Sequence, residues 1–292
     1  MKRGKMFFRG FIILSVIAFC GAGTAVYGQE APGGKLLQSE RMRALVPAEG
    51  LVSVTDPLDS YGADIVSRRA PWGRLKVVYR TGNGDWVERP WNRSNVLTDE
   101  GERVTLRPDD SGDPVTIAQS FSLAGNAIDW EIEIGTRDGK EVEIGDLALY
   151  LPWSIARSEN PDTIFERSFT KHHFISGNGS FLYFTRPSGE PPYMMILAGE
   201  GTGLEYFDGG RGGYKVYMHS AVAAAGVESG TWRQPNTSVK IGGDAGRETL
   251  KYRFRIAWAE SWDLMRQLLY DEGLFDIRVV PGMTLPTDLK AQ

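Results

Sequence analysis

Few side chains in this sequence could carry acid–base chemistry, since histidine occurs three times in 292 residues. Glu205 with His173 or His219 could form the acid–base pair of a sugar epimerase or mutarotase, in which one group releases a proton while the other accepts one. Two of the carboxylates of Glu166, Glu205 and Asp208 could instead pair as in glycoside hydrolysis. The competing interpretation is structural, because strand histidines commonly pack within the fold and carboxylates commonly form surface ion pairs.

A second set of side chains could bind a sugar without reacting with it. Sugar sites combine an aromatic face, which packs on the C–H side of a pyranose, with polar groups that hydrogen-bond its hydroxyls. The aromatic candidates are Trp153, Tyr206 and Trp232, and the polar candidates are His173, Glu205 and Arg233. The alternative is that these aromatic rings belong to the core of a large β protein.

Other chemistries have little support. His172 and His173 are adjacent, so in a strand their side chains point to opposite faces and are badly placed to chelate one metal. Residues 109–113 (DDSGD) resemble a calcium loop but lack its bidentate Glu, and a solvated turn is the better interpretation. No GxSxG nucleophile motif occurs. The sequence therefore predicts no metal site and no cofactor.

The first 28 residues have the order of a secretory signal peptide. A basic start precedes the apolar run of residues 11–20 (FIILSVIAFC), and small residues lead to Gly28, after which cleavage is expected. Lipid anchoring at Cys20 is the alternative, but Phe19 fits poorly with the small residue that such processing prefers. We expect a secreted or periplasmic protein without a membrane span after cleavage, because the run is shorter than a bilayer requires.

Composition narrows the possible partners. Cys20 is the single cysteine, so the mature chain has no disulfide and no thiolate site. The net charge is −4 and the basic residues are scattered, which is unlike a nucleic-acid binder. We therefore expect no nucleic-acid partner, and the candidate sugar-binding side chains lead us to expect a carbohydrate partner.

The elements that must position these side chains are almost all strands. Apolar residues alternate with period two in residues 115–123, 128–134 and 142–149, and turn sequences around Gly125-Asn126 and Asp138-Gly139 separate them. This is the pattern of successive hairpins, and we predict that the three strands form a meander. Many strands with turn signals at short intervals predict an all-β fold, a large antiparallel β-sandwich.

One helix is expected near the C-terminus. Residues 260–270 carry Trp262, Met265, Leu268 and Leu269 at amphipathic spacing, and Ser261 can cap the start. The predicted organisation is a signal peptide (1–28), a flexible lead-in (29–40), a β-sandwich (41–259), and a helix with an extended linker-like tail (260–292).

Several segments resemble one family of secreted proteins. These are residues 146–153 (DLALYLPW), 173–179 (HFISGNG), 182–187 (LYFTRP), 203–207 (GLEYF), 217–220 (YMHS) and, most specifically, 269–286 (LYDEGLFDIRVVPGMTLP). Together they resemble the N-terminal region of the DUF5695 family, over roughly residues 35–290.

The resemblance implies a fold and an architecture. Its members look like multi-domain glycosidases, in which a β-supersandwich of the galactose mutarotase type precedes an (α/α) helical toroid that usually carries the catalytic acids. The present sequence ends where such a toroid would begin, so the resemblance implies a possible separately encoded toroid partner. It transfers no catalytic residue to this chain.

Three hypotheses for function follow. The first is a secreted carbohydrate-binding or accessory β-sandwich that is non-catalytic alone. The second is a sugar-active enzyme, either a glycoside hydrolase or a mutarotase-type catalyst, that uses Glu205 with His173 or His219. The third is a structural domain whose terminal helix docks a separate partner. Opposed pKa shifts of two converging groups would favour the second hypothesis.

Overall fold

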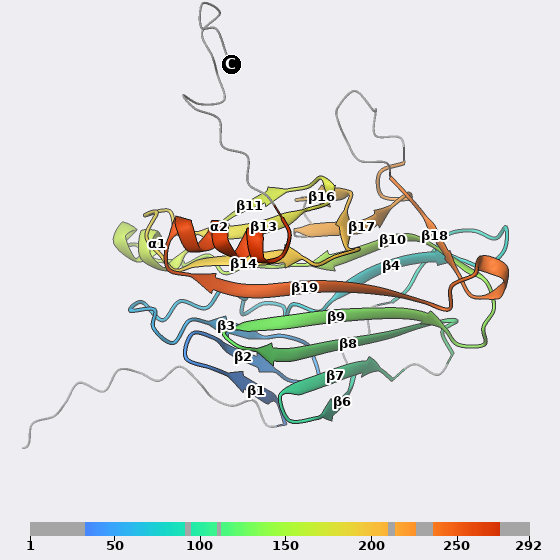
Figure 1. The fold of residues 1–292 in the computed structure, drawn as a ribbon, viewed down its shortest axis with the longest axis horizontal. Helices are drawn as coiled ribbons and strands as arrows, with labels where there is room; N and C mark the ends of the chain where they lie inside the picture. The colour runs from blue at the N-terminus through green and yellow to red at the C-terminus, as the bar shows by residue number, and fades with distance from the viewer. Residues whose placement is uncertain (1–32, 91–94, 110–111, 210–213, 226–235, 275–292) are drawn as a thin grey trace, which may run out of the picture.

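The computed structural model describes residues 33–90, 95–109, 112–209, 214–225 and 236–274. Two antiparallel sheets enclose a common hydrophobic core (Figure 1). The all-β sandwich predicted from the sequence is therefore confirmed, together with its C-terminal helix. None of the helices within the described ranges is long and apolar enough to cross a membrane.

The larger sheet has eight strands. In spatial order they are β11 (Thr170–Phe174), β13 (Phe181–Thr185), β14 (Tyr193–Ala198), β19 (Thr249–Ala259), β9 (Ala127–Thr136), β8 (Val115–Ala124), β7 (Arg103–Pro108) and β6 (Asn95–Asp99).

The second sheet has six strands. Its path runs β16 (Tyr206–Asp208), β17 (Lys215–Ser220), β10 (Val142–Tyr150), β4 (Leu75–Arg80) and β5 (Val87–Glu88), and β18 (Val239–Ile241) also pairs with β10.

Two small sheets complete the described strands. The first has the order β1 (Lys35–Gln38), β2 (Arg43–Val46) and β3 (Ser53–Thr55). The second pairs β12 (Gly177–Asn178) with β15 (Gly203–Leu204). Part of the expected flexible lead-in thus forms strand β1, because Leu37 is buried in the core and the strand pairs with β2 along its whole length.

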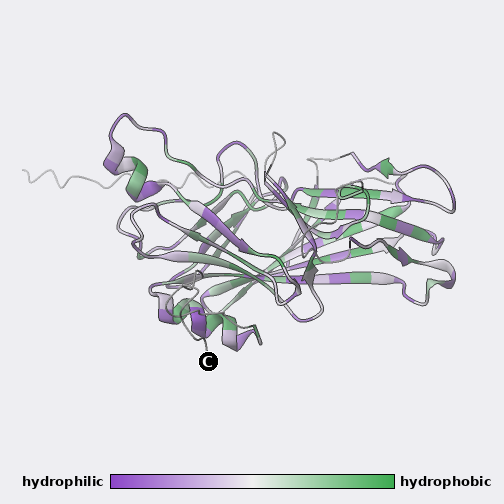
Figure 2. Cartoon of the chain, turned by 90° about the horizontal axis from the view of Figure 1, so that it is seen from above, coloured by the Kyte–Doolittle hydropathy of each residue, from purple (hydrophilic) through white to green (hydrophobic). Residues whose placement is uncertain are grey.

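Alternation along the strands selects the side chains that fill the core. In β9, Ile128, Trp130, Ile132 and Ile134 are fully buried, while the residues between them are partly exposed. Figure 2 shows this banding of hydrophobic and hydrophilic residues along the strands. The indole of Trp130 stacks on Phe121 of the neighbouring strand with 5.3 Å between ring centroids.

The predicted meander is wrong in its third strand. Strands β8 and β9 form the expected hairpin through Gly125, but β10 pairs with β4, β17 and β18 in the other sheet. Both edges of β9 are already occupied, by β8 on one side and β19 on the other. The turn after β9 therefore carries the chain from one sheet to the other. Periodicity identifies the buried face of a strand but not its partner.

The predicted helix is α2 (Trp262–Asp271), and Ser261 caps it by accepting a hydrogen bond from the backbone N–H of Leu264. Its buried residues Met265 and Leu269 pack on the outer face of the eight-stranded sheet, against Tyr193 and Met195. Because the helix covers one face of β14 and the core covers the other, the strand is buried on both faces and its sequence is a continuous apolar run. Met265 and Leu269 of the predicted stripe thus pack on the sandwich itself, whereas Trp262 of the same stripe is 51% exposed.

A second helix, α1 (Pro161–Arg167), was not expected from the sequence. Asn160 accepts from the backbone N–H of Asp162, and Pro161 occupies the first turn, where its missing N–H costs nothing. The helix stands at the periphery of the molecule (Figure 2) and buries none of its residues.

Candidate functional site

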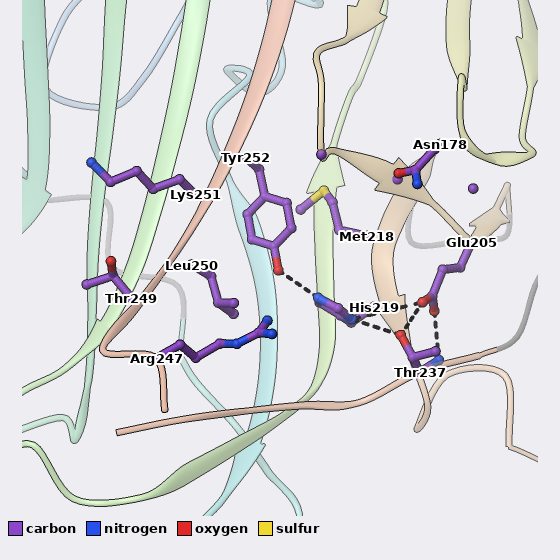
Figure 3. A pocket seen from close by; sticks show the side chains of 13 residues that line it. Asn178, Glu205, Met218, His219, Thr237, Arg247, Thr249, Leu250, Lys251 and Tyr252 are labelled. Carbon is purple, nitrogen blue, oxygen red and sulfur yellow. Dashed lines mark hydrogen bonds and ion pairs between the residues drawn. The ribbon is translucent and has the colours of Figure 1, made fainter. Parts of the chain in front are cut away.

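A pocket with a volume of about 510 Å³ lies where the two sheets approach each other. Glu205 follows β15, His219 lies on β17 of the six-stranded sheet, and Tyr252 lies on β19 of the eight-stranded sheet (Figure 3). Thr237, just before β18, also lines it. We call this site the Glu205–Tyr252 pocket.

A chain of hydrogen bonds crosses the pocket. The hydroxyl of Tyr252 lies 2.6 Å from Nε2 of His219, and Nδ1 of His219 lies 3.1 Å from Oγ1 of Thr237. Oγ1 of Thr237 donates in turn to Oε1 of Glu205 (Figure 3). These contacts connect the two sheets through side chains that are far apart in the sequence.

The protonation of this chain follows from donor counting. An ionised Glu205 can only accept, so Thr237 donates its single hydroxyl hydrogen to the carboxylate and accepts from Nδ1–H of His219. The neutral imidazole then accepts at Nε2 from the hydroxyl of Tyr252. We assign the Nδ1–H tautomer to His219 on this basis.

The carboxylate of Glu205 is held from several sides. Its Oε2 accepts from the backbone N–H of Thr237 at 2.9 Å and from Oγ of Ser220 at 3.1 Å. Burial raises the pKa of Glu205, and the hydrogen bonds from Thr237 and Ser220 oppose part of that rise by stabilising the charged form.

Burial acts on His219 in the opposite direction. It lowers the pKa of His219 to about 4, and the positive charge of Arg247 contributes to the decrease. Burial also raises the pKa of Tyr252, so the phenol is protonated and the imidazole neutral near pH 7. Glu205 and His219, whose Oε1 and Nδ1 atoms are 4.0 Å apart, therefore have opposed pKa shifts.

Two nitrogen-bearing side chains, those of Arg247 and Asn178, face the pocket without a partner among the described residues. The guanidinium of Arg247 points toward His219 and Tyr252 in Figure 3, and the amide of Asn178 lies on the opposite side. Neither side chain makes a hydrogen bond or ion pair with another described residue. They are the free donors that a polar ligand could use.

Glycines place these two side chains. Arg247 follows the short 3-10 helix η1 (Gly243–Ala245), which Gly242 precedes with a φ of 74° and Gly246 follows. A Cβ at Gly242 would lie 2.4 Å from the carbonyl oxygen of Lys140, so this turn requires glycine. Asn178 is opposite Gly203 in the β12–β15 pair, where the two backbones approach closely.

The sequence candidates are divided between two places. Glu205 and His219 come together in the pocket, as the acid–base hypothesis requires. His173 lies outside the residues that line the pocket, with Nδ1 3.2 Å from the hydroxyl of Tyr214 and its ring 4.0 Å from that of Phe207. Burial lowers the pKa of His173 as well.

Two of the three aromatic candidates, Trp153 and Tyr206, also lie outside the pocket lining. Trp153 packs edge-on against Tyr214, and its Nε1 donates to the carbonyl of Phe169 at 2.9 Å. Tyr206 packs on Tyr217, with 5.4 Å between ring centroids. Trp232 and Arg233 fall outside the described residues.

The remaining carboxylates do not join Glu205 among the residues that line the pocket. Asp208 forms an ion pair with Lys215 at 3.1 Å, and Glu166 lies on α1. Across the described ranges there is also no group of three or more His, Cys, Asp or Glu side chains that could hold a metal ion.

Sequence reasoning missed Tyr252, Thr237, Arg247 and Asn178. The alternation of residues 250–258 places Tyr252 on the inward face of its strand, but it does not distinguish a hydrogen-bonding tyrosine from a packing one. The other three lie in or beside turns, where no periodic signal exists.

Comparison with solved structures shows the fold of this chain in other proteins. A polysaccharide lyase superposes with a TM-score of 0.59 and 12% identity, over 82% of this chain and 34% of the lyase. The chain thus spans about a third of that enzyme, and the match shows a shared β-sandwich fold.

Two shorter proteins match over most of their length. One is a putative aldose 1-epimerase from Escherichia coli K12, with a TM-score of 0.47 and 8% identity over 78% of this chain and 99% of that chain. The other is a galactose mutarotase-like protein from Lactobacillus casei, with a TM-score of 0.49 and 9% identity over 78% of this chain and 100% of that chain. No protein-family model and no curated protein matches the sequence.

Proposed function

We propose that this protein binds a saccharide in the Glu205–Tyr252 pocket. The observation that carries the proposal is the pair of unpartnered polar groups, Arg247 and Asn178, facing a pocket in which Glu205, Thr237, His219 and Tyr252 hydrogen-bond one another. Sugar hydroxyls both donate and accept, so they can pair with a guanidinium and an amide that are already in place. The fold shared with part of a polysaccharide lyase supports the same ligand class.

The hydrogen-bond chain favours a second candidate, which is acid–base catalysis on the bound sugar. Tyr252 would transfer its phenolic proton to Nε2 of His219, and the phenolate so formed would then accept a proton from the sugar. The resulting imidazolium would be stabilised by Glu205 through Thr237, and the guanidinium of Arg247 would stabilise the phenolate. In this proposal Tyr252 is the catalytic residue, and His219 and Glu205 act through it.

Location and architecture belong to the same proposal. We propose secretion after removal of residues 1–28, on the order of charged, apolar and small residues in that segment. Membership of the DUF5695 family and partnership with a helical toroid are proposals that the sequence resemblance carries.

The test is calorimetric titration of the full chain with a panel of oligosaccharides, with product analysis of the same samples. Arg247→Ala should weaken binding by about tenfold, the value of one hydrogen bond from a charged donor. Arg253→Ala is the matched control, since Arg253 is exposed on β19 and forms an ion pair with Glu131 away from the pocket. Binding that Arg247→Ala leaves intact would refute the placement of the site.

Product analysis separates the two candidates. Binding without turnover supports the accessory role. Turnover that Tyr252→Phe abolishes, while Arg253→Ala does not, supports acid–base catalysis. Turnover that survives Tyr252→Phe would contradict the role given to the phenol.

A further inference from the structure

A second hollow, separate from the Glu205–Tyr252 pocket, lies over the small three-stranded sheet. One face of that sheet packs on the core through residues such as Leu37 and Val54. The opposite face carries Leu36, Arg43 and Leu45, which are half-buried and line a groove of about 580 Å³. The register of β1 and β2 places Leu36 directly opposite Leu45, so the floor of the groove is a regular sheet surface.

The walls of the groove come from two loops and the end of α1. Arg68 and Arg69 follow the bridge between Val66 and Trp153, and Arg157 and Arg167 come from the segment around α1. We call this hollow the arginine groove. It is lined by five arginines in all.

Backbone hydrogen bonds hold the walls in place. The N–H of Ser154 donates to the carbonyl of Ile65 at 2.8 Å, and the N–H of Ser67 donates to the carbonyl of Pro152 at 3.1 Å. Oγ of Ser168 accepts from the N–H of Ala156 at 3.0 Å. The arginine side chains therefore project from a fixed rim.

The charge in the groove is poorly compensated. The single carboxylate that lines it in the described part of the chain is that of Asp64, whose Oδ1 accepts from the backbone N–H groups of Val54 and Val66, both at 3.0 Å. Burial raises the pKa of Asp64, and its hydrogen bonds oppose part of that rise.

Four of the five arginines have no ion-pair or hydrogen-bond partner for their side chains among the described residues. They are Arg43, Arg69, Arg157 and Arg167. Other arginines do form ion pairs, as Arg186 does with Asp59 and Arg255 with Asp129. In a chain of net charge −4, four uncompensated guanidinium groups around one hollow are a local concentration of positive charge.

We propose that the arginine groove binds a polysaccharide carrying carboxylate or sulfate groups. The planar guanidinium fork matches the geometry of such oxyanions and holds them by two hydrogen bonds at once. The apolar floor of Leu36 and Leu45 offers a surface for the C–H faces of sugar rings. Among the described residues, no aromatic side chain lines the groove, and this part of the chain offers no stacking platform for nucleic-acid bases there.

The test measures binding of the full chain to oligogalacturonate, to sulfated dextran oligomers, to neutral dextran and to single-stranded DNA, at low and at high salt. The variant Arg69→Gln/Arg157→Gln should weaken binding to one or both anionic saccharides by at least about tenfold. The control Arg107→Gln/Arg253→Gln removes the same charge from the exposed side of the eight-stranded sheet, and should change affinity by less than about twofold after screening. Whether the carboxylated or the sulfated oligomer binds identifies the anionic group.

The proposal is overturned if neither anionic saccharide binds at low salt, if neutral dextran binds equally well, or if the control loses as much affinity as the groove variant. Single-stranded DNA binding more tightly than either saccharide would also overturn it. The imidazole NMR signal of His219 should stay in place, because His219 does not line the groove. A shift of that signal, with affinity retained by the groove variant, would assign the ligand to the other pocket.

Discussion

Replacing Thr237 by Val tests whether the hydrogen-bond chain in the pocket is built as described. Valine has nearly the same shape, so the change removes the hydroxyl while the backbone N–H that donates to Glu205 stays. The loss comprises one hydrogen bond to a carboxylate and one from the His219 imidazole, both part-buried. These are worth about 1.5–3 and about 0.5–1.5 kcal/mol, so unfolding should become easier by about 2–4 kcal/mol.

Urea denaturation of the two proteins at pH 7 measures this difference, and Ser238→Ala is the control. Ser238 is the next residue, and its exposed hydroxyl donates to Glu143, where water can replace it. Its loss should cost less than about 1 kcal/mol. Nitrogen NMR of the His219 ring should also show that the fixed Nδ1–H tautomer is lost in Thr237→Val. Equal denaturation midpoints for the two variants, with an unchanged tautomer, would refute the assigned chain.

Three further predictions concern His219 in the pocket and two packing positions outside its lining. His219 has a folded-state pKa of about 4, below its ordinary value of 6.5, so its stabilising contribution is present above pH 6.5 and is lost as pH falls through 4. Between about pH 7 and about pH 3.5, wild type should therefore lose about 3 kcal/mol more unfolding free energy than His219→Gln. Parallel curves of unfolding free energy against pH for the two proteins would contradict this. Arg186→Met leaves the buried carboxylate of Asp59 without its ion-pair partner and should lower the unfolding free energy, measured by urea denaturation, by about 3–5 kcal/mol. The double variant Asp59→Asn/Arg186→Met also removes the carboxylate charge and should lose less unfolding free energy. Equal losses in the two variants would argue against an uncompensated charge. Gly145→Ala places a Cβ 2.6 Å from a ring carbon of Trp86 and should cost about 1–3 kcal/mol, while an unchanged thermal midpoint would show that the indole moves aside.

Local signals in the sequence predicted much of the fold. The capping residue Ser261 and the amphipathic spacing of the apolar residues that follow it predicted α2, because both signals depend only on residues within one short segment. The hairpin through Gly125 was equally local. The placement of β10 in the other sheet was not predictable in this way, since it depends on which strand edges remain free once β9 is paired. The first turn of α1 did carry a signal, Asn160 followed by Pro161, that could have been recognised.

The pocket was predictable only in part. His219 was singled out because histidine is scarce, and Glu205 because it stands in a stretch of aromatic and acidic residues. Tyr252 and Thr237 complete the chain from positions that lie beyond His219 in the sequence, and their roles depend on how the two sheets face each other. The arginine groove was hidden for the same reason, because its basic residues are scattered along the sequence and converge in space.

The most direct test of the central claim uses the three histidines as reporters. His219 lies in the Glu205–Tyr252 pocket, whereas His172 and His173 lie on β11, outside the pocket lining. The imidazole signals of the full chain would be followed by NMR during titration with each oligosaccharide of the panel. If the pocket binds the saccharide, at least one sugar shifts the His219 signals and leaves those of His172 and His173 in place. If every sugar leaves His219 unmoved, or if binding moves His173 alone, the site has been assigned to the wrong part of the sandwich.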